Sequence, residues 1–366
     1  MSKTIAISTG GGDAPGLNAV IRSAVLSAHQ KGWKCVGIRN GFNGLLSPDE
    51  FAHNVGIIDL TPESVRGITH LGGTILGSTN KGNPLHYPIV QQDGSIGEID
   101  RTGELVEMCK KVGIDALVSI GGDGSMEIAH ALAQQGLQVI GVPKTIDNDL
   151  EKTSATFGFE TAVEFATNCI DRLHSTAESH ERVMIVEVMG RYAGWIALHS
   201  GIAGTADCIL IPEIPYTIDS VLQKINDRES KGHHFTIIVI AEGAITKDGQ
   251  VSTIGKSIGQ AIRLGGAGEK LLHEIERHTE KESRLVVLGH LQRGGMPTAN
   301  DRLLALRFGA AAIRAIDDGY TDAMVALDPP DVHIVPLSEV TKRMKRVAID
   351  SDIIRTAREI GISFGD

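Results

Sequence analysis

The sequence lacks the features that mark several large classes of protein. Its 366 residues contain no run of about 18 apolar residues, so no transmembrane helix is expected. The amino-terminal MSKTIAISTGGG lacks the long apolar stretch of a signal peptide. There is also no low-complexity tract, block of like charge or linker rich in Ser and Pro. These absences predict a soluble cytoplasmic protein that does not act at a membrane.

Cysteine and net positive charge are also scarce. The four cysteines, Cys35, Cys109, Cys169 and Cys208, form no CxxC pair, which argues against a zinc site or a redox motif. A reduced, intracellular protein is the simplest interpretation. The net charge is −10 with His counted as neutral, and an acidic surface disfavours non-specific binding to nucleic acid. A few local Arg and Lys residues can still hold an anionic substrate.

What the chain does contain is a repeated alternation of strand-like and helix-like segments. Its length suits two domains, and hydrophobic residues make up 42%. Residues 4–8 are apolar enough for a buried strand, a glycine-rich turn follows at 10–16, and apolar residues then recur at helical spacing to residue 28. The next expected strand, 34–38, completes a βαβ unit, which implies a parallel sheet.

The same alternation continues along the chain. Buried strands are expected over residues 115–120, 138–142, 183–188, 208–211, 235–241 and 285–288, and helices over 125–135, 301–317 and 350–359. Residues 40–105 are expected to carry loops or a hairpin. The fold class is therefore α/β, with helices on both faces of mostly parallel sheets. Ligands of such folds bind at the carboxyl ends of the strands.

A glycine loop, Gly10–Gly16, follows the first expected strand and opens the first helix. Glycines let the backbone approach a phosphate, and a helix N-terminus offers N–H groups and the positive end of a dipole. Taken alone, a tight structural turn explains the segment equally well. The loop does not match GxGxxG, which disfavours a Rossmann dehydrogenase, and it does not match the Walker pattern.

A second loop, Gly121-Gly122-Asp123-Gly124-Ser125, repeats the arrangement with a carboxylate inside the turn. A carboxylate beside a phosphate is repulsive unless a cation lies between them, so Asp123 is a candidate Mg²⁺ ligand. The alternative is an ordinary turn-forming Asp. The same turn occurs in NAD kinases and lipid kinases, so it indicates phosphoryl chemistry more than a particular substrate.

An acidic segment, PKTIDND, follows another expected strand. Asp147 could orient or deprotonate an acceptor hydroxyl, and Lys144 could hold donor phosphates, which are the two tasks of phosphoryl transfer. As an isolated string it would best be interpreted as a solvated loop. Its place after two glycine loops favours a functional role.

Five segments together resemble the 6-phosphofructokinase family: STGGGDAPGLNAVIR, IGGDGS, PKTIDND, VEVMGRYAGWIAL and LGHLQRGG. The segments occur in the family's order, and the match as a whole runs from about residue 3 to about residue 320, while the last forty-odd residues carry no recognisable signature. The resemblance implies transfer of the γ-phosphoryl group of ATP to the 1-hydroxyl of fructose 6-phosphate, giving fructose 1,6-bisphosphate in glycolysis. It also implies two doubly wound domains: 1–157 with about 291–340 for the nucleotide, and 158–290 with about 341–366 for the sugar phosphate.

On the donor side, the resemblance implies a nucleotide site that uses both glycine loops. The residues expected to contact the nucleotide are Gly12, Asn80, Lys81, Gly122, Asp123, Gly124 and Ser125. Asp123 would be the Mg²⁺ ligand. Asp147 would be the catalytic base, with Thr145 and Asp149 beside it and Arg191 facing the transferred group.

On the acceptor side, the resemblance implies a site shared between subunits. The residues expected to contact fructose 6-phosphate are Thr145, Ile146, Asp147, Met189, Gly190, Arg191, Glu242, His290, Leu291, Gln292 and Arg293. Arg182 and Arg284 would reach the 6-phosphate from a neighbouring subunit, since a phosphate dianion favours several Arg forks. Each could instead be a surface ion-pair partner. A homotetramer is the family's common form, although a dimer could also build the shared site.

The motifs disagree on the phosphoryl donor. Familiar bacterial members carry Gly where this chain has Lys144, and an Arg after the LGS stretch where this chain has Thr79-Asn80 and then Lys81. Lys81 or Lys144 could take over part of that arginine's task. Pyrophosphate users of the family carry Asp at the position of Gly124 together with Lys at that of Lys144. An Asp would intrude on the inner phosphate of a nucleotide, whereas Gly leaves that volume open, so ATP is expected and pyrophosphate is the alternative.

Two alternative functions account for fewer of these motifs. An NAD or lipid kinase would share only the GGDGS turn. A non-catalytic sugar-phosphate sensor on the same fold should have lost Asp123 or Asp147, and both are present.

Allosteric control by a nucleotide is also expected to be weak. In allosteric bacterial members, Arg residues of the first helix and a nearby loop, with Lys residues of a KGK-like stretch, hold an ADP effector. Here Arg22 is kept, but Leu26 and Leu60 stand where further Arg residues would be, and the later stretch is Lys231-Gly232-His233-His234.

Overall fold

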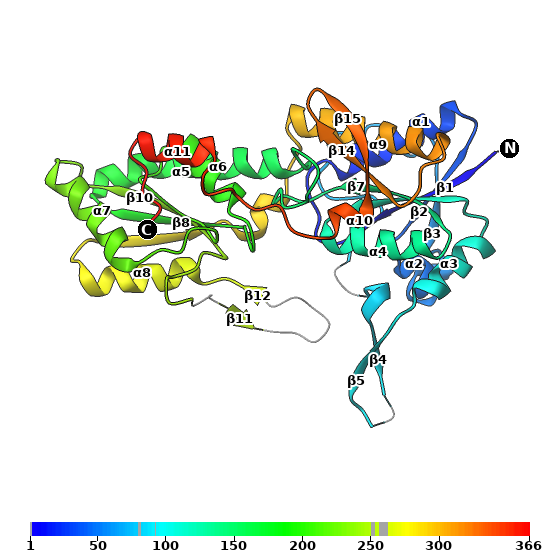
Figure 1. The fold of residues 1–366 in the computed structure, drawn as a ribbon, viewed down its shortest axis with the longest axis horizontal. Helices are drawn as coiled ribbons and strands as arrows, with labels where there is room; N and C mark the ends of the chain where they lie inside the picture. Colours follow the sequence, from blue (N-terminus) through cyan, green and yellow to red (C-terminus); the bar gives the residue numbers. More distant parts are fainter. Residues whose placement is uncertain (1, 80–81, 92, 250–252, 256–262) are drawn as a thin grey trace.

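The computed structural model describes residues 2–79, 82–91, 93–249, 253–255 and 263–366. Its elements gather around two separate sheets, which lie side by side along the long axis of the molecule (Figure 1). No helix within these ranges is long and apolar enough to cross a membrane.

The larger sheet has seven strands. They are β1 (Thr4–Thr9), β2 (Lys34–Ile38), β3 (Ile57–Leu60), β6 (Ala116–Gly121), β7 (Gln138–Pro143), β14 (Ala323–Asp328) and β15 (Asp331–Pro336). Their order is β15-β14-β7-β6-β1-β2-β3. The five inner strands are parallel, and the two edge strands pair antiparallel with their neighbours. Strand β6 is buried along its whole length, as expected for a parallel strand covered on both faces.

Helices cover both faces of this sheet. One face carries α1 (Leu17–Gln30) and α9 (Ala299–Asp317), and the other carries α2 (Asn43–Leu46), α3 (Thr102–Lys111), α4 (Asp123–Gln134) and α10 (Leu337–Val340). The apolar stripe predicted for α1 is buried against the sheet and α9. Helix α9 approaches α1 closely at Gly309, where a Cβ would lie 2.5 Å from the carbonyl oxygen of Val20. Glycine is therefore required at that contact.

The smaller sheet has four parallel strands in the order β13-β8-β10-β9. They are β8 (Val183–Val188), β9 (Cys208–Leu210), β10 (Thr236–Ala241) and β13 (Ser283–Val287). One face packs against α5 (Phe159–His180), α6 (Trp195–Ala203) and α11 (Asp352–Glu359), and the other against α7 (Ile218–Ser230) and α8 (Ala267–His278). The α/β class with doubly wound, mostly parallel sheets is thus confirmed.

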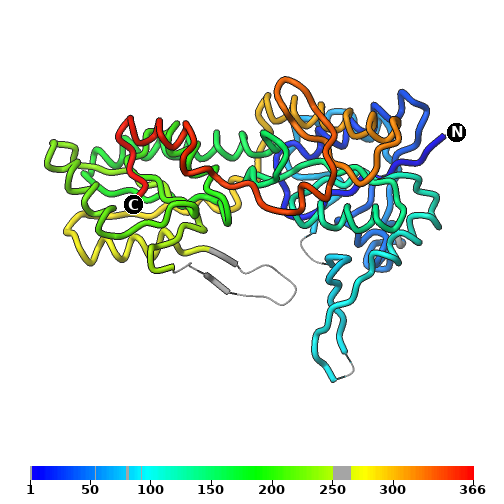
Figure 2. The backbone as a smooth tube through the Cα atoms, in the orientation of Figure 1, coloured from blue at the N-terminus to red at the C-terminus, as the bar shows by residue number. Residues whose placement is uncertain are grey.

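The chain passes between the sheets more than once, as the backbone trace shows (Figure 2). It crosses before α5, returns through the 3₁₀ helix η4 (Gly289–Arg293) into α9, and crosses again between α10 and α11. The hairpin of β4 (Tyr87–Val90) and β5 (Ile96–Ile99) projects away from the larger sheet (Figure 1) and confirms the hairpin expected within 40–105. The remaining short elements are η1 (Pro48–Glu50), η2 (Ala52–Asn54), η3 (Pro84–His86), β11 (Thr253–Gly255) and β12 (Arg263–Leu264).

Candidate active site

Three of the motif loops lie side by side at the carboxyl ends of central strands of the larger sheet. They follow β1, β6 and β7, which are adjacent and parallel, so their carboxyl ends meet. Backbone hydrogen bonds join them: Gly10 N donates to Ile120 O at 2.9 Å, and Lys144 N donates to Gly121 O at 2.9 Å. The topology thus assembles both glycine loops and the acidic segment into one surface.

Ser125 packs the two glycine loops together. A Cβ on Gly10 would lie 2.7 Å from the Ser125 Oγ, and a Cβ on Gly121 would lie 2.2 Å from the Ser125 Cβ. Gly124 differs, because a Cβ there would meet no atom of the described chain within 4 Å. Within the protein the tight position of this loop is therefore Gly121, and the space beside Gly124 is open.

A pocket of about 390 Å³ lies elsewhere, beside β14 and β15, whereas one of about 320 Å³ opens on the first glycine loop. The latter is lined by Gly11, Gly12, Asp13, Gly73, Thr74, Ser78 and Thr79. The Ser78 hydroxyl donates to Gly11 O, and Arg293 Nη1 donates to Asp13 O at 3.1 Å. Sequence reasoning did not assign Gly73 or Thr74, since no charge or motif marks them. Asn80 and Lys81, which it did assign, lie outside the described residues.

The acidic segment after β7 forms a tight turn with a buried carboxylate. Asp147 N donates to the Thr145 Oγ1 at 3.1 Å, and Ile146 is fully buried beneath. Burial raises the pKa of the Asp147 carboxyl and also that of Asp149, and the charge of Asp147 raises the pKa of Asp149 further by repulsion. The Asp147 Oδ1 is buried without a hydrogen-bond partner in the described part of the chain. A buried carboxylate oxygen without a donor is costly unless a ligand supplies one.

Lys144 connects this segment to the first glycine loop. Its ammonium donates to Gly12 O, and its side chain is almost fully buried. Burial, together with the nearby charge of Arg293, lowers the pKa of Lys144 to about 8, while Asp123 is among the carboxylates that oppose this. A cation therefore lies between the two loops, close to where donor phosphates are expected.

The smaller sheet contributes a second group at the carboxyl ends of its strands. Met189, Gly190 and Arg191 follow β8, and Glu242 follows β10. The Nε and Nη2 atoms of Arg191 are buried without a hydrogen-bond partner in the described ranges, and its Cζ lies 5.0 Å from the centre of the Tyr192 ring. Burial raises the pKa of Glu242, while the charge of Arg191 acts to lower it. An unpaired buried guanidinium indicates an anionic ligand.

The segment His290–Arg293 forms η4 and joins the two groups. Gln292 is fully buried and its Oε1 accepts from Met189 N at 3.4 Å, which holds η4 against the loop after β8. Leu291 and His290 are exposed beside it. Arg293 extends from η4 to the first glycine loop, where a Cβ on Gly12 would lie 2.8 Å from its Nη1. Its charge also lowers the pKa of Asp147.

The residues around Asp123 fit a magnesium ion. Asp123 opens α4 with an exposed carboxylate, and its charge helps to raise the pKa values of both Asp147 and Asp149. The described residues contain no group of three His, Cys, Asp or Glu side chains arranged to hold a metal. Mg²⁺ does not need one, because it commonly takes one or two carboxylates together with water and substrate phosphates.

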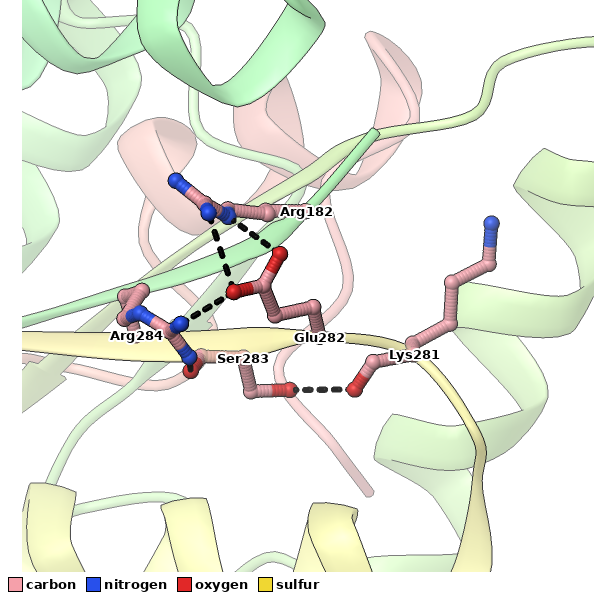
Figure 3. A network of polar contacts seen from close by, with 5 residues as sticks. All are labelled: Arg182, Lys281, Glu282, Ser283 and Arg284. Atoms are coloured by element: carbon pink, nitrogen blue, oxygen red, sulfur yellow. Dashed lines mark hydrogen bonds and ion pairs between the residues drawn. The ribbon is translucent and has the colours of Figure 1, made fainter. Parts of the chain in front are cut away.

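Arg182 and Arg284 lie apart from all these residues. They stand at the amino ends of β8 and β13, where Arg182 Nε donates to Glu282 Oε2 at 2.7 Å and Arg284 also pairs with Glu282 (Figure 3). The hydrogen bond from Arg182, followed by the charges of Arg182 and Arg284, lowers the pKa of Glu282. Within one chain the sheet separates both arginines from Arg191.

Glycine loops, clustered carboxylates and a guanidinium with two nitrogens unpaired in the described chain thus lie at the carboxyl ends of parallel strands, where α/β folds bind their ligands. The family model described as Phosphofructokinase matches residues 4–316, and the chain belongs to that family.

Known relatives match the chain over nearly its full length. It is 49% identical to the ATP-dependent 6-phosphofructokinase of Chloroflexus aggregans, over 99% of this chain and 98% of the relative. It is 48% identical to the pyrophosphate–fructose 6-phosphate 1-phosphotransferase of Amycolatopsis mediterranei, over 94% and 96%.

Solved structures agree with this. A pyrophosphate-dependent phosphofructokinase from Nitrosospira multiformis superposes with a TM-score of 0.80 at 22% identity, covering 100% of this chain and 93% of that one. Phosphofructokinase from Saccharomyces cerevisiae superposes with a TM-score of 0.76 at 29% identity over 93% of this chain, which spans 45% of the yeast chain.

Proposed function

We propose that the chain is an ATP-dependent 6-phosphofructokinase, which forms fructose 1,6-bisphosphate and ADP in glycolysis. The observation that carries this proposal is that two residues of the site, Asp147 and Arg191, have buried polar atoms without a hydrogen-bond partner in the described chain: a carboxylate oxygen and two guanidinium nitrogens. One suits an acceptor hydroxyl and the other suits a phosphoryl group. Relatives 49% identical over the full chain support the same activity. A cytoplasmic location fits this role.

In this mechanism Asp147 accepts the proton of the 1-hydroxyl as that oxygen bonds to the γ-phosphorus, and the bond to the bridging oxygen of ADP breaks. Burial raises the pKa of Asp147 towards neutrality, which suits a general base. Arg191 holds the transferred group, since its Nε and Nη2 atoms have no hydrogen-bond partner among the described residues. Mg²⁺ on Asp123 would supply further positive charge at the donor phosphates.

The donor follows from Gly124 rather than from overall identity, because the ATP-dependent and pyrophosphate-dependent relatives are almost equally similar. The open space beside Gly124 leaves room for a nucleotide's inner phosphate. Coupled assays with fructose 6-phosphate and Mg²⁺, run in parallel with ATP and with pyrophosphate, test the proposal. A higher kcat/KM with pyrophosphate would assign the alternative donor, and no turnover with either would overturn the activity.

We also propose that the two sheets belong to two domains, each of which binds a different substrate. The larger sheet carries the glycine loops, so residues 1–157 with about 291–340 would hold the nucleotide. The smaller sheet carries Arg191 and Glu242, so residues 158–290 with about 341–366 would hold the sugar phosphate.

The positions of Arg182 and Arg284 support an oligomer with shared sites. Strand β8 has six residues, so its two ends are about 20 Å apart at roughly 3.3 Å per residue. One phosphate cannot reach both ends, but a neighbouring copy could place its Arg182 and Arg284 at the sugar site. A homotetramer is favoured, and a dimer would suffice.

Mixing two inactive variants tests this sharing. Asp147→Ser chains and Arg284→Ala chains, each feeble at low fructose 6-phosphate, are expected to regain activity when refolded together. In a mixed oligomer some sites would combine an intact Asp147 with an intact Arg284 from the neighbour. Mixtures that stay inactive, although mass spectrometry shows hybrid oligomers, would place both residues in the same chain's site.

We further expect ADP and phosphoenolpyruvate to leave the fructose 6-phosphate saturation curve almost unchanged. Arg22 is engaged with Val65 O at 2.8 Å, Leu60 is buried, and the loop of Lys231 carries two histidines instead of more lysine. Each missing charge-assisted hydrogen bond removes about 1.5–3 kcal/mol of effector binding. A strong shift of half-saturation with either compound would contradict this.

A further inference from the structure

The C-terminal segment that leaves α10 carries no sequence motif, yet it runs directly past the acidic turn. Residues 343–347, here called the strap, lie where the chain crosses from the larger sheet to α11 (Figure 2). Lys345 N donates to Asp149 O at 2.8 Å, and Met344 forms an antiparallel bridge with Leu150. Arg343 pairs with Glu151, with 3.0 Å between its Nε and the Oε1. The strap is therefore held along the turn by a backbone hydrogen bond, an isolated bridge and an ion pair.

The Lys345 side chain holds the inner part of the same turn. Its Nζ donates to Asn148 Oδ1 at 3.1 Å, to Thr153 O at 3.0 Å and to Ser154 O at 2.9 Å, which uses all three ammonium hydrogens. Asn148 directly follows Asp147 and has a positive φ of 52°, a conformation that needs support from its surroundings. Its Oδ1 also accepts from Thr156 N at 3.2 Å.

The strap contacts the Arg191 loop as well. Trp195 Nε1 donates to Lys345 O at 3.3 Å, and the Lys345 Nζ lies 5.5 Å from the centre of the Trp195 ring. Two residues further on, Val347 N donates to Glu213 Oε1 at 2.9 Å, and the Glu213 carboxylate also accepts from Gly194 N at 3.1 Å. Gly194 ends the loop that begins after β8, and Trp195 is the first residue of α6. Lys345 thus touches both loops that carry the proposed chemistry.

We propose that Lys345 is a positioning residue that fixes the Asp147 turn relative to the Arg191 loop. The proposal rests on the proposed function, since it assumes that Asp147 and Arg191 act on the same substrate. Lys345 acts on the reaction indirectly, through its contacts with Asn148 and Trp195. Burial lowers the pKa of Lys345 to about 8, so holding the ammonium here is unfavourable in itself and is offset by its three acceptors.

The first test compares Lys345→Met with Lys342→Met in the full chain. Lys342 is a matched control because it lies three residues earlier and is exposed. Lys345→Met is expected to lower kcat by about 10–100-fold, as small misplacements of reacting groups do, with less than about threefold change in KM for ATP. Lys342→Met should leave both unchanged. A folded Lys345→Met enzyme with normal kcat would overturn the proposal.

Lys345→Arg covers the case in which the methionine variant does not fold. It keeps the charge, but a planar fork cannot direct three N–H groups to oxygens that converge on one ammonium. Its kcat should fall between those of the wild type and Lys345→Met. A normal kcat in folded Lys345→Arg, when Lys345→Met does not fold, would also overturn the positioning role.

A double-mutant cycle with Asp147→Ser separates positioning from general damage. If Lys345 acts by placing Asp147, adding Lys345→Met to Asp147→Ser should lower kcat by less than about threefold further. A second loss as large as in the wild type would mean that Lys345 serves the structure only. If Asp147→Ser alone keeps its kcat, the proposed function's base assignment fails, which is a different result from a normal kcat in Lys345→Met.

Discussion

Replacing Asp147 with Ser is expected to lower kcat by about 10²–10⁴-fold, the usual contribution of a general base, while KM for fructose 6-phosphate changes little. The carboxylate acts when the acceptor hydroxyl loses its proton, so its loss is felt mainly in the transition state. Its position favours this role: it follows β7, next to both glycine loops, with one oxygen buried and unpaired in the described ranges. Steady-state kinetics with saturating ATP measures the effect. Near-normal kcat would refute the assignment.

Asp147→Asn is the matched control, because the amide keeps the size of the carboxyl but cannot accept the proton. It should lose as much kcat as the serine variant. In the wild type, kcat should fall as the pH drops through the raised pKa of Asp147, because the protonated carboxyl is no base. In the Asp147 variants, kcat should no longer fall with decreasing pH over this range.

Asp147→Asn should lose activity but gain stability against unfolding at neutral pH. Burial raises the pKa of Asp147 in the folded chain, so folding takes up a proton between the unfolded value of about 3.9 and the raised one. Stability is therefore lost as the pH rises through that window, and the penalty is complete at neutral pH. Asp147→Asn, which carries no charge, is expected to unfold at a higher temperature at pH 7. An inactive variant that is also more stable cannot owe its inactivity to misfolding.

Local pattern predicted most of the fold that positions this site. The first βαβ unit and the strands β6, β7, β8 and β10 were correct to within about one residue, because buried parallel strands read as short apolar runs between glycine turns. Helix α5 (Phe159–His180) was not predicted. Its buried residues include three alanines, so its apolar stripe is weak despite its 22 residues. Strands β14 and β15 were also missed, since β14 pairs with β7 from far along the chain.

The candidate site, like the fold, was predicted from the sequence only in part. Residues within motifs, such as Asp123 and Asp147, could be assigned because their types and spacing match phosphoryl transfer. Thr74 and Lys345 could not, because each lies in an unremarkable stretch and gains its position only from tertiary structure. The structure places the protein's own tight contact at Gly121, which depends on how Ser125 packs.

Gly124→Asp is expected to lower ATP-dependent kcat/KM by about 10²–10³-fold, while pyrophosphate-dependent kcat/KM falls less or rises. The protein itself tolerates the change, because a Cβ at Gly124 meets nothing within 4 Å in the described chain and an Asp in the first turn suits the α4 dipole. The new carboxylate would face the inner phosphate of ATP, where two like charges 4 Å apart repel by about 4 kcal/mol near a protein surface. Pyrophosphate has no nucleoside beyond its second phosphate and can shift away.

Lys144 makes the exchange of donors plausible. Its ammonium already responds to the charge of Asp123, so a carboxylate at the next residue would be partly neutralised. Gly124→Asn is the control, since it adds the same bulk without charge and separates steric exclusion from repulsion. The quantity to compare is the ratio of kcat/KM for ATP to that for pyrophosphate in wild type and both variants. If the wild type already prefers pyrophosphate, or if Gly124→Asp keeps the wild-type ratio, Gly124 does not select the donor and Lys144 or another group must do so.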